Sequence, residues 1–304
     1  MKSECRVAVT TLVLLILIGV CSAQKVAVTF DDLPLNGALP AGVTRVEIAR
    51  DTLAVLKKYH VPAAYGFVNA KKLEGNIDAA EALKLWAASE PVGNHTYSHL
   101  NLDQNSPEAF EREVELNEPA LELLTAAGGD WHWLRYPYLH EGETLEKRRA
   151  VRTYLAQRGY RIAQVTIDWE DYLWNTAYAR CEDRKDKQSM EWLRSSYLKM
   201  ASDYIDLSSE LAKTVYGHDI NHVLLLHLGA FSSTILPDTF DLLRKKRLKL
   251  VTLEEAESDP AYGSDPDMGL ENAGSLLEQM MAVKKIKFPA VTEKPYKELK
   301  EICQ

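Results

Sequence analysis

The sequence is poor in several features that would assign it to a special class of protein. It holds only 4 cysteines in 304 residues, and its 15 glycines and 12 prolines are close to average usage. A disulfide-dense scaffold, a collagen-like chain and a low-complexity chain are therefore excluded. Basic residues number 36 against 44 acidic ones, for a net charge of −8. Because a nucleic-acid binder needs a basic face to neutralise phosphates, that class is excluded as well.

Long hydrophobic runs are also scarce, and the longest one lies at the N-terminus. It covers residues 7–20, follows Lys2 and Arg6, and is followed by the small residues Ser22 and Ala23. This pattern predicts a secretory signal over residues 1–23, cleaved after Ala23. The run is shorter than the roughly 20 residues of a membrane-spanning helix. We therefore expect a periplasmic or secreted protein with no stable membrane anchor after cleavage.

The cysteines leave two possibilities open. Cys5 and Cys21 belong to the predicted signal, which leaves Cys181 and Cys303. In an exported protein these two can form a disulfide that ties the C-terminal tail to the middle of the chain. Two separate buried thiols are the alternative. Neither cysteine has the close cysteine partner that a structural zinc site requires.

Apolar runs and amphipathic stretches alternate along the rest of the chain. Internal repeats, Gly/Pro/Ser linkers and the phosphate-binding pattern G-x-G-x-x-G are absent. The apolar runs predict strands at residues 25–30, 63–68, 91–94, 133–135, 162–167, 222–226 and 248–252. Helical patterns predict helices at residues 43–59, 78–89, 106–127, 144–158, 189–215 and 273–285.

This alternation is typical of parallel βαβ units. We predict an α/β fold of one domain over residues 24–255, a distorted (β/α) barrel that is closed or incomplete. A doubly wound open sheet is the alternative. The polar residues 256–304 are expected to pack on this domain or to trail from it.

Chemically active residues follow the predicted strands. Because the carboxyl ends of parallel strands point to one face of a barrel, five chain segments are expected to converge there. Their polar residues are Asp31, Asp32, His95, His99, Arg135, Asp168 and His227.

Asp32, His95 and His99 form a candidate metal site. The two imidazoles lie four residues apart, which on a helical turn places them on one face, and Asp32 adds a carboxylate. Three protein ligands with one open position are typical of catalytic zinc. We expect one divalent metal, with zinc the first choice and Co²⁺, Ni²⁺ or Mn²⁺ as alternatives. His218 and His222 have the same spacing but precede a strand, so we interpret them as a loop pair without metal.

Asp31 and His227 are candidates for acid–base chemistry. Neighbouring side chains on an extended segment point in different directions, so Asp31 can face a metal-bound water while Asp32 binds the metal. A loop or helix cap is the alternative role for Asp31. His227 ends a buried strand, and Asp168 ends another and could keep the imidazole charged.

The motifs that carry these residues resemble those of the polysaccharide deacetylases, the NodB-homology domains of carbohydrate esterase family 4. The similar segments are TFDD ending at Asp32, HTYSH from His95 to His99, RYPY from Arg135, Asp168 with its aromatic neighbours, and LLH ending at His227. Their order along the chain also matches.

The resemblance implies a role for each site residue. Asp31 would be the general base, oriented by Arg135 through a charge-assisted fork, and His227 the general acid, tuned by Asp168. Leu225 would line the acetyl-methyl pocket and the backbone N–H of Tyr138 would bind the oxyanion. The aromatic residue that meets the sugar would be Tyr172 or Trp174. Two departures from the family pattern are Leu33 after the Asp pair, expected to reshape the rim, and a long segment over residues 175–221. That segment would form a lid or cleft wall, or else a solvated insertion.

Three functional hypotheses follow. The first is a secreted, metal-dependent enzyme that removes acetyl groups from a polysaccharide or oligosaccharide such as peptidoglycan, chitin or acetylated xylan. The second keeps the fold but takes a non-sugar amide as substrate. The third is a glycan-binding protein that has lost turnover, against which the intact Asp31, Arg135 and His227 argue. The choice between N- and O-acetyl groups stays open, and the sequence does not indicate an oligomeric state.

Overall fold

The computed structural model describes residues 24–126 and 128–304, so the predicted signal at residues 1–23 lies outside the described residues. In this part of the chain, parallel strands form one sheet of seven, in the order β5-β4-β3-β2-β1-β6, with β7 beside the start of β1. The strands are β1 (Lys25–Leu33), β2 (Tyr65–Val68), β3 (Val92–Asn94), β4 (Trp133–Leu134), β5 (Arg161–Ile162), β6 (His222–His227) and β7 (Lys249–Val251).

The sheet curls until its two edges meet. After β5 the chain continues to Ile167, which forms an isolated parallel bridge with Leu224 of β6. The predicted strand at residues 162–167 is therefore reduced to two strand residues and one bridge. Its backbone groups bond elsewhere, since the Ala163 carbonyl accepts from the Arg135 side chain and the Gln164 N–H donates to Glu257. The fold is the expected α/β barrel, distorted at this closing segment.

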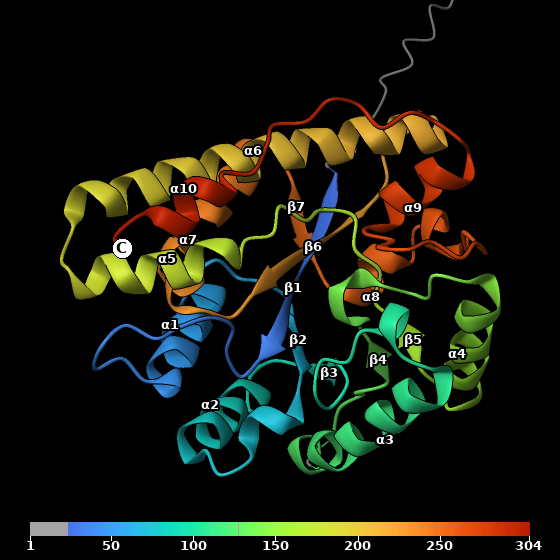
Figure 1. Ribbon diagram of the computed structural model, residues 1–304, viewed down its shortest axis with the longest axis horizontal. Helices are drawn as coiled ribbons and strands as arrows, with labels where there is room; N and C mark the ends of the chain where they lie inside the picture. Colours follow the sequence, from blue (N-terminus) through green and yellow to red (C-terminus); the bar gives the residue numbers. More distant parts are fainter. Residues whose placement is uncertain (1–23, 127) are drawn as a thin grey trace, which may run out of the picture.

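Helices cover the outside of the curled sheet (Figure 1). The α-helices of the described residues are α1 (Arg45–Lys58), α2 (Ile77–Ala87), α3 (Pro107–Leu124), α4 (Leu145–Gln157), α5 (Leu173–Asp183), α6 (Lys187–Tyr216), α7 (Ala230–Lys245), α8 (Leu253–Glu257), α9 (Leu276–Val283) and α10 (Tyr296–Glu301), of which α8 packs on the inner cluster and α10 on α5. Side-chain caps fix several starts: Thr44 forms a capping box with Glu47, and Ser106 caps α3 with Pro107 in the first turn.

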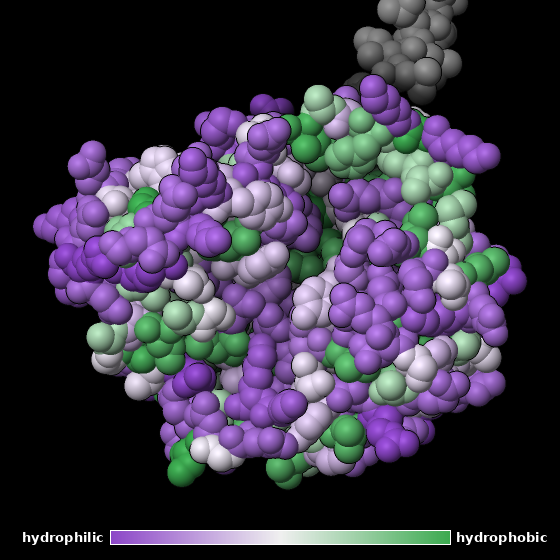
Figure 2. Space-filling view, viewed as in Figure 1, coloured by the Kyte–Doolittle hydropathy of each residue, from purple (hydrophilic) through white to green (hydrophobic). Residues whose placement is uncertain are grey.

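The apolar core has two parts, which the two faces of the strands separate. Inside the barrel, Ala27, Phe67, Trp133 and Val223 pack together, and α8 adds apolar contacts from Leu253. A larger cluster lies between the strands and the covering helices. The strand β1 contributes to both, which is why all but its first residue are buried. The face shown in Figure 2 is mostly hydrophilic, with small scattered apolar patches.

The long segment over residues 175–221 is a packed layer. It forms most of α5 and all of α6, and α6 buries one face that includes Leu193, Tyr197 and Ile205. Figure 1 shows α6 running along one side of the molecule, where it packs against α5, α7 and α9, and α10 packs against α5. No described residue of 175–221 lines the cavity described below, so the expected lid is not found. Among the described helices, none is long and apolar enough to cross a membrane.

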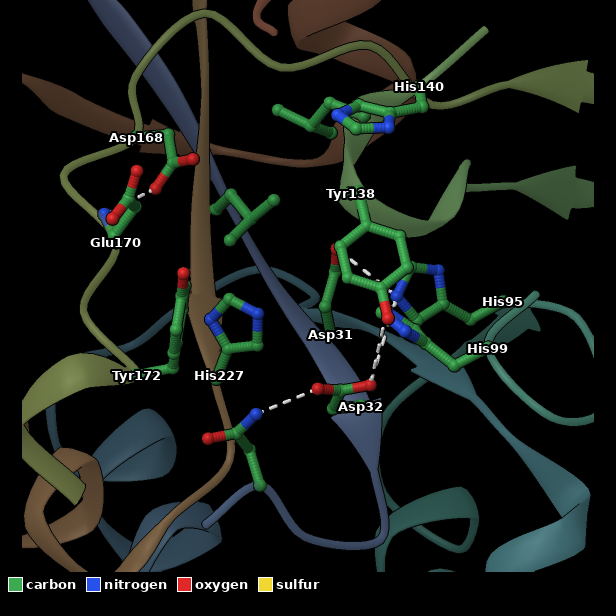
Figure 3. A pocket seen from close by; sticks show the side chains of 13 residues that line it. Asp31, Asp32, His95, His99, Tyr138, His140, Asp168, Glu170, Tyr172 and His227 are labelled. Carbon is green, nitrogen blue, oxygen red and sulfur yellow. Dashed lines mark hydrogen bonds and ion pairs between the residues drawn. The ribbon is translucent and has the colours of Figure 1, made fainter. Parts of the chain in front are cut away.

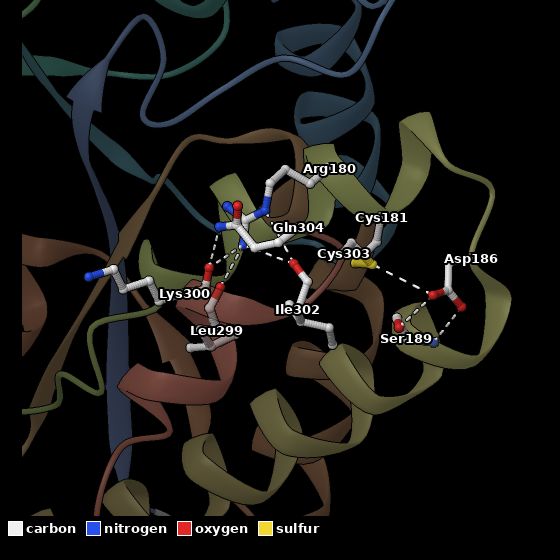
Figure 4. The surroundings of a disulfide bond; sticks show 9 residues. All are labelled: Arg180, Cys181, Asp186, Ser189, Leu299, Lys300, Ile302, Cys303 and Gln304. Atoms are coloured by element: carbon white, nitrogen blue, oxygen red, sulfur yellow. Dashed lines mark hydrogen bonds between the residues drawn. A yellow bond between two sulfur atoms is a disulfide. The ribbon is translucent and has the colours of Figure 1, made fainter.

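The C-terminal segment returns to the middle of the chain. Cys181 in α5 and Cys303 after α10 form a disulfide across a sequence separation of 122 residues (Figure 4). Arg180 beside it donates hydrogen bonds to the carbonyls of Leu299 and Ile302. Residues 296–304 are therefore held against α5 by a covalent bond and by capping of the last helix.

Candidate active site

A cavity of ≈ 470 Å³ opens at the carboxyl ends of the strands. Because all the strands are parallel, the segments that follow them meet at this end of the barrel. The described residues that line the cavity are Asp31, Asp32, Asn36, His95, His99, Tyr138, Leu139, His140, Asp168, Glu170, Tyr172, Leu225 and His227 (Figure 3).

Asp32, His95 and His99 present their ligand atoms to one point. One donor atom from each residue lies within 4.8 Å of the other two. The Nε2 atoms of His95 and His99 are 4.0 Å and 3.6 Å from Oδ1 of Asp32. The imidazole rings are 4.8 Å apart, measured between their centroids. The three residues that the sequence singled out as metal ligands thus form one cluster.

The two histidines reach this point from a loop. The expectation that residues 95–99 form a helical turn is wrong, because Thr96 and His99 adopt left-handed backbone angles, with φ of 60° and 64°. Buried amide side chains hold the loop: Asn69 donates to the carbonyls of His95 and Thr96, and Asn94 accepts from the Thr96 N–H. The convergence of the imidazoles is a property of this loop and of its buried asparagines.

The protonation states of these residues suit a divalent cation. Nδ1 of His95 lies 2.8 Å from the carbonyl oxygen of Arg135, which places the proton on Nδ1 and leaves the Nε2 lone pair facing the cluster. Burial lowers the pKa of both His95 and His99 to about 3, so both are neutral ligands. Burial raises the pKa of Asp32, but Lys72 and His99 outweigh it and hold this pKa well below its usual range. Two neutral imidazoles and one carboxylate form a donor set that fits zinc.

Asp31 is buried beside this cluster and paired with Arg135. Nη1 of Arg135 donates to both oxygens of Asp31, at 3.1 Å and 3.2 Å. Nη2 donates instead to the hydroxyl of Thr29. The contact is therefore made by one nitrogen to two oxygens, and not by the expected two-nitrogen fork. Burial raises the pKa of Asp31, and the Arg135 charge opposes that rise.

His227 is paired with Asp171, which corrects the prediction that Asp168 is its partner. Nδ1 of His227 lies 2.6 Å from Oδ1 of Asp171, whose other oxygen accepts from the His227 N–H and the Ser232 hydroxyl. Burial lowers the pKa of His227, but Asp171 outweighs it and raises this pKa to about 9. Asp168 lines the cavity and instead accepts a hydrogen bond from the Glu170 N–H, and burial raises its pKa to about 6.

The turn that follows Ile167 explains this exchange of partners. Glu170, between Asp168 and Asp171, has a left-handed φ of 58°. Asp171, three residues further along than Asp168, consequently points toward the end of β6. The sequence contained a signal for this alternative, since D-W-E-D offers two carboxylates after one strand.

The expected substrate contacts divide into two groups. Tyr138, Tyr172 and Leu225 line the cavity. Measured between ring centroids, Tyr138 is 4.4 Å from His99 and Tyr172 is 5.1 Å from His227. Trp174 does not line it, because its side chain is fully buried and its Nε1 donates to Ser196. Of the two expected sugar-facing aromatic residues, only Tyr172 is therefore in place.

Two other residues expected at or near the site lie elsewhere. Leu33 is fully buried beside Gly66 and Trp86 and does not line the cavity, so the expectation that it reshapes the rim is wrong. His222 is buried at the start of β6 and bonds to Thr166, while His218 is exposed. Neither histidine of this second pair lines the cavity, and His222 belongs to the strand β6 and not to a loop as expected.

Sequence reasoning missed two polar neighbours of Asp32. The Lys72 ammonium lies 3.2 Å from Oδ1 of Asp32 and donates to the carbonyls of Asp32 and Leu35. Asn36 donates to Oδ2 of Asp32 at 2.7 Å. Asn36 has the signal of lying four residues after Asp32, whereas Lys72 comes from a distant turn and has none.

Comparison with known proteins points to one family. A family model described as polysaccharide deacetylase matches residues 20–163. A peptidoglycan-N-acetylglucosamine deacetylase of Bacillus cereus is 28% identical over 156 residues, which are 51% of this chain and 48% of that protein. The chain therefore spans about half the length of this curated relative.

Solved structures share the fold. A CE4 family pseudoenzyme from Bacillus anthracis superposes with a TM-score of 0.53 at 16% identity, covering 77% of this chain and 66% of that one. A chitin deacetylase from the fungal pathogen Colletotrichum lindemuthianum superposes with a TM-score of 0.50 at 20% identity, covering 77% of this chain and 88% of that one. At such identities the likeness concerns the architecture alone.

Proposed function

We propose that this chain, whose residues 20–163 match the polysaccharide deacetylase family model, is a metal-dependent enzyme that hydrolyses acetyl groups on a glycan. The observation that carries the proposal is the meeting of three units around one cavity. These are the Asp32–His95–His99 cluster, the Asp31–Arg135 pair and the Asp171–His227 pair. Pure binding of a glycan needs neither a buried base nor a charged acid.

Asp32, His95 and His99 would hold the metal. A divalent cation bound there supplies Lewis-acid activation of water and of a carbonyl group. Neutral imidazoles and an ionised carboxylate are the protonation states that such binding requires. Zinc fits this donor set first, and Co²⁺, Ni²⁺ or Mn²⁺ are alternatives.

The chain's own residues divide the proton transfers between them. As the water oxygen bonds to the acetyl carbon, Asp31 accepts a proton from that water. Arg135 holds the Asp31 carboxylate in position. The tetrahedral oxyanion on the substrate accepts a hydrogen bond from the backbone N–H of Tyr138. His227, kept charged by Asp171, gives its proton to the leaving nitrogen or oxygen as the bond to the acetyl carbon breaks. Leu225 packs against the acetyl methyl group, and acetate is released.

The proposed substrate is an acetylated polysaccharide or its oligomers, and the proposed location is outside the cytoplasm. The peptidoglycan-N-acetylglucosamine deacetylase relative supports an N-acetylglucosamine polymer as the first candidate. The Cys181–Cys303 disulfide supports export, because disulfides persist in oxidising compartments.

Release of acetate from a panel tests the proposal. The panel holds N-acetylglucosamine oligomers, peptidoglycan fragments and acetylated xylan, each incubated with and without a chelator. We expect chelator-sensitive release from at least one member, restored by added Zn²⁺. A chain that binds one metal per molecule but releases no acetate from any member would contradict the proposed activity and favour a glycan-binding role.

A further inference from the structure

The C-terminal segment reaches the rim of the cavity. Glu170, which lines the cavity, has both carboxylate oxygens occupied by this segment. Lys294 lies 2.9 Å from one oxygen, and the Tyr296 hydroxyl donates to the other at 2.7 Å. The sequence separation between Tyr296 and Glu170 is 126 residues. A part of the chain beyond the family-matched residues 20–163 therefore contacts a residue that lines the cavity.

Exposed aromatic surface lies along the same wall. The Tyr172 side chain is 38% exposed and its ring lies 5.1 Å from that of His227. Tyr296 is 54% exposed, although its hydroxyl is fixed by Glu170. His227, Tyr172 and Glu170 thus line the cavity, and Tyr296 lies directly outside them, bonded to Glu170. Two exposed phenol rings therefore lie near one carboxylate.

The helix α10, which begins at Tyr296, is anchored to the rest of the molecule. The disulfide at Cys303 and the hydrogen bonds from Arg180 anchor the helix α10, which Tyr296 begins (Figure 4). Leu299 of the same helix is buried in the main core. A ring anchored in this way loses little conformational freedom when a ligand packs on it, which favours binding.

We propose that Tyr296, Glu170 and Tyr172 form a subsite for the sugar unit next to the one that carries the reacting acetyl group. A pyranose ring has an apolar face that packs on a phenol ring, and hydroxyls that donate to a carboxylate. The subsite makes the enzyme prefer oligomers to a single sugar. This inference rests on the proposed deacetylase activity and names the length of the substrate at that site.

Two substitutions of Tyr296 separate stacking from positioning. Tyr296→Ala removes the ring, whereas Tyr296→Phe keeps the ring and removes only the hydroxyl that Glu170 accepts. Phe288→Ala is the matched control, because Phe288 is an aromatic residue that is 36% exposed in the same C-terminal segment, whereas the contacts to Glu170 come from Lys294 and Tyr296. Each metal-loaded, full-length variant is assayed for kcat and KM with N-acetylglucosamine oligomers of increasing length, from the monomer upward, and with an aryl acetate.

The subsite predicts a loss that depends on substrate length. In Tyr296→Ala, KM for the longer oligomers should rise about three- to tenfold, the usual range for one aromatic contact, with kcat, the monomer and the aryl acetate unchanged. Tyr296→Phe and Phe288→Ala should match the parent. An equal loss on every substrate, or no change with the oligomers, would overturn the subsite.

Direct binding keeps the test decisive if turnover fails. Calorimetric titration of the metal-loaded full chain with the tetramer of N-acetylglucosamine should show weaker binding for Tyr296→Ala than for the parent. Absence of acetate release from the parent on every substrate counts against the proposed activity, whereas equal tetramer affinity of parent and variant counts against the subsite. If Tyr296→Ala does not fold, Glu170→Gln takes its place with the same expected dependence on length.

Discussion

The two walls of the cavity are built in different ways. The metal side consists of Asp31 and Asp32 at the end of the strand β1, His95 and His99 in the loop after β3, and Arg135 directly after β4. These strands pair in parallel with their neighbours, and the buried Asn69 and Asn94 hold the loop that carries the histidines.

The acid side consists of His227, Asp171, Glu170 and Tyr172. Only His227 ends a regular strand, while the other three follow a segment that joins the sheet through a single bridge at Ile167. In place of strand pairing, hydrogen bonds from distant residues hold this segment. The Ser232 hydroxyl donates to Asp171, and the Tyr296 hydroxyl donates to Glu170. Strand ends and the loop after β3 therefore position the proposed metal ligands and the base, whereas long-range contacts position the acid.

Loss of a metal ligand should have the largest effect on activity. We expect Asp32→Ala and His99→Ala to lose bound metal and to lower kcat/KM by roughly 10⁴-fold or more, because activation of water and polarisation of the carbonyl disappear together. Elemental analysis of the purified protein and initial rates measure both quantities. His218→Ala is the control with an exposed histidine, and loss of metal there would mean that the ligand set has been misassigned.

Asp31→Asn should separate the base from the metal. The substitution keeps the size of the side chain but removes the proton acceptor, so we expect metal content to stay at the parent level and kcat to fall by ~10² to 10⁴. Parent-like activity of the metal-loaded variant would exclude Asp31 as the base.

Asp171→Asn tests the acid side through its pH dependence. In the parent, Asp171 outweighs burial and raises the pKa of His227 to about 9, so the imidazolium donor is lost only as the pH rises through that value. The stabilising free energy of this pair is likewise complete below the unfolded pKa and lost as the pH rises through about 9. In Asp171→Asn the alkaline limb of kcat should move to lower pH, with kcat reduced about 10- to 100-fold at its optimum.

Asp168→Asn is the matched comparison for that experiment. Asp168 lies in the same turn but does not bond to His227. The alkaline limb of kcat should therefore move much less in Asp168→Asn than in Asp171→Asn. A larger displacement in Asp168→Asn than in Asp171→Asn would restore Asp168 as the partner of His227.

Cys303→Ser should have the smallest effect on turnover and a clear effect on stability. The disulfide closes a loop of 122 residues, and its removal should lower the free energy of unfolding by about 2 to 5 kcal/mol. Denaturant unfolding measures the loss, and metal content should stay unchanged because the metal side lies in other parts of the chain. Cys181→Ser should lose the same amount, and the double variant no more; a larger loss in the double variant would indicate separate thiols.

Much of the fold was predictable because its signals are local. Apolar runs placed all seven strands to within a few residues, and caps such as Ser106 placed helix starts. The predicted strand at residues 162–167 is longer than the observed one. Its apolar side chains lie where the barrel closes, but its backbone groups bond to Arg135 and Glu257. No pattern within that segment reveals such distant partners.

The candidate site shows the same division. The predicted cluster of Asp32, His95 and His99 is confirmed, but a loop with left-handed residues, and not a helical turn, joins the two histidines. The prediction that Trp174 contacts the sugar is wrong, because its side chain is fully buried. The sequence does not distinguish an aromatic residue of the core from one that lines a site.

By itself, the sequence determined that a parallel barrel forms and that acidic, imidazole and guanidinium groups follow its strands, because hydrophobic periodicity and strand direction are encoded locally. Only the tertiary structure decided that Asp171 and not Asp168 holds His227, that Lys72 stands beside Asp32, and that Tyr296 reaches the cavity rim. These contacts depend on left-handed turns and on chain segments up to 126 residues apart, whose approach is set by packing of the whole core.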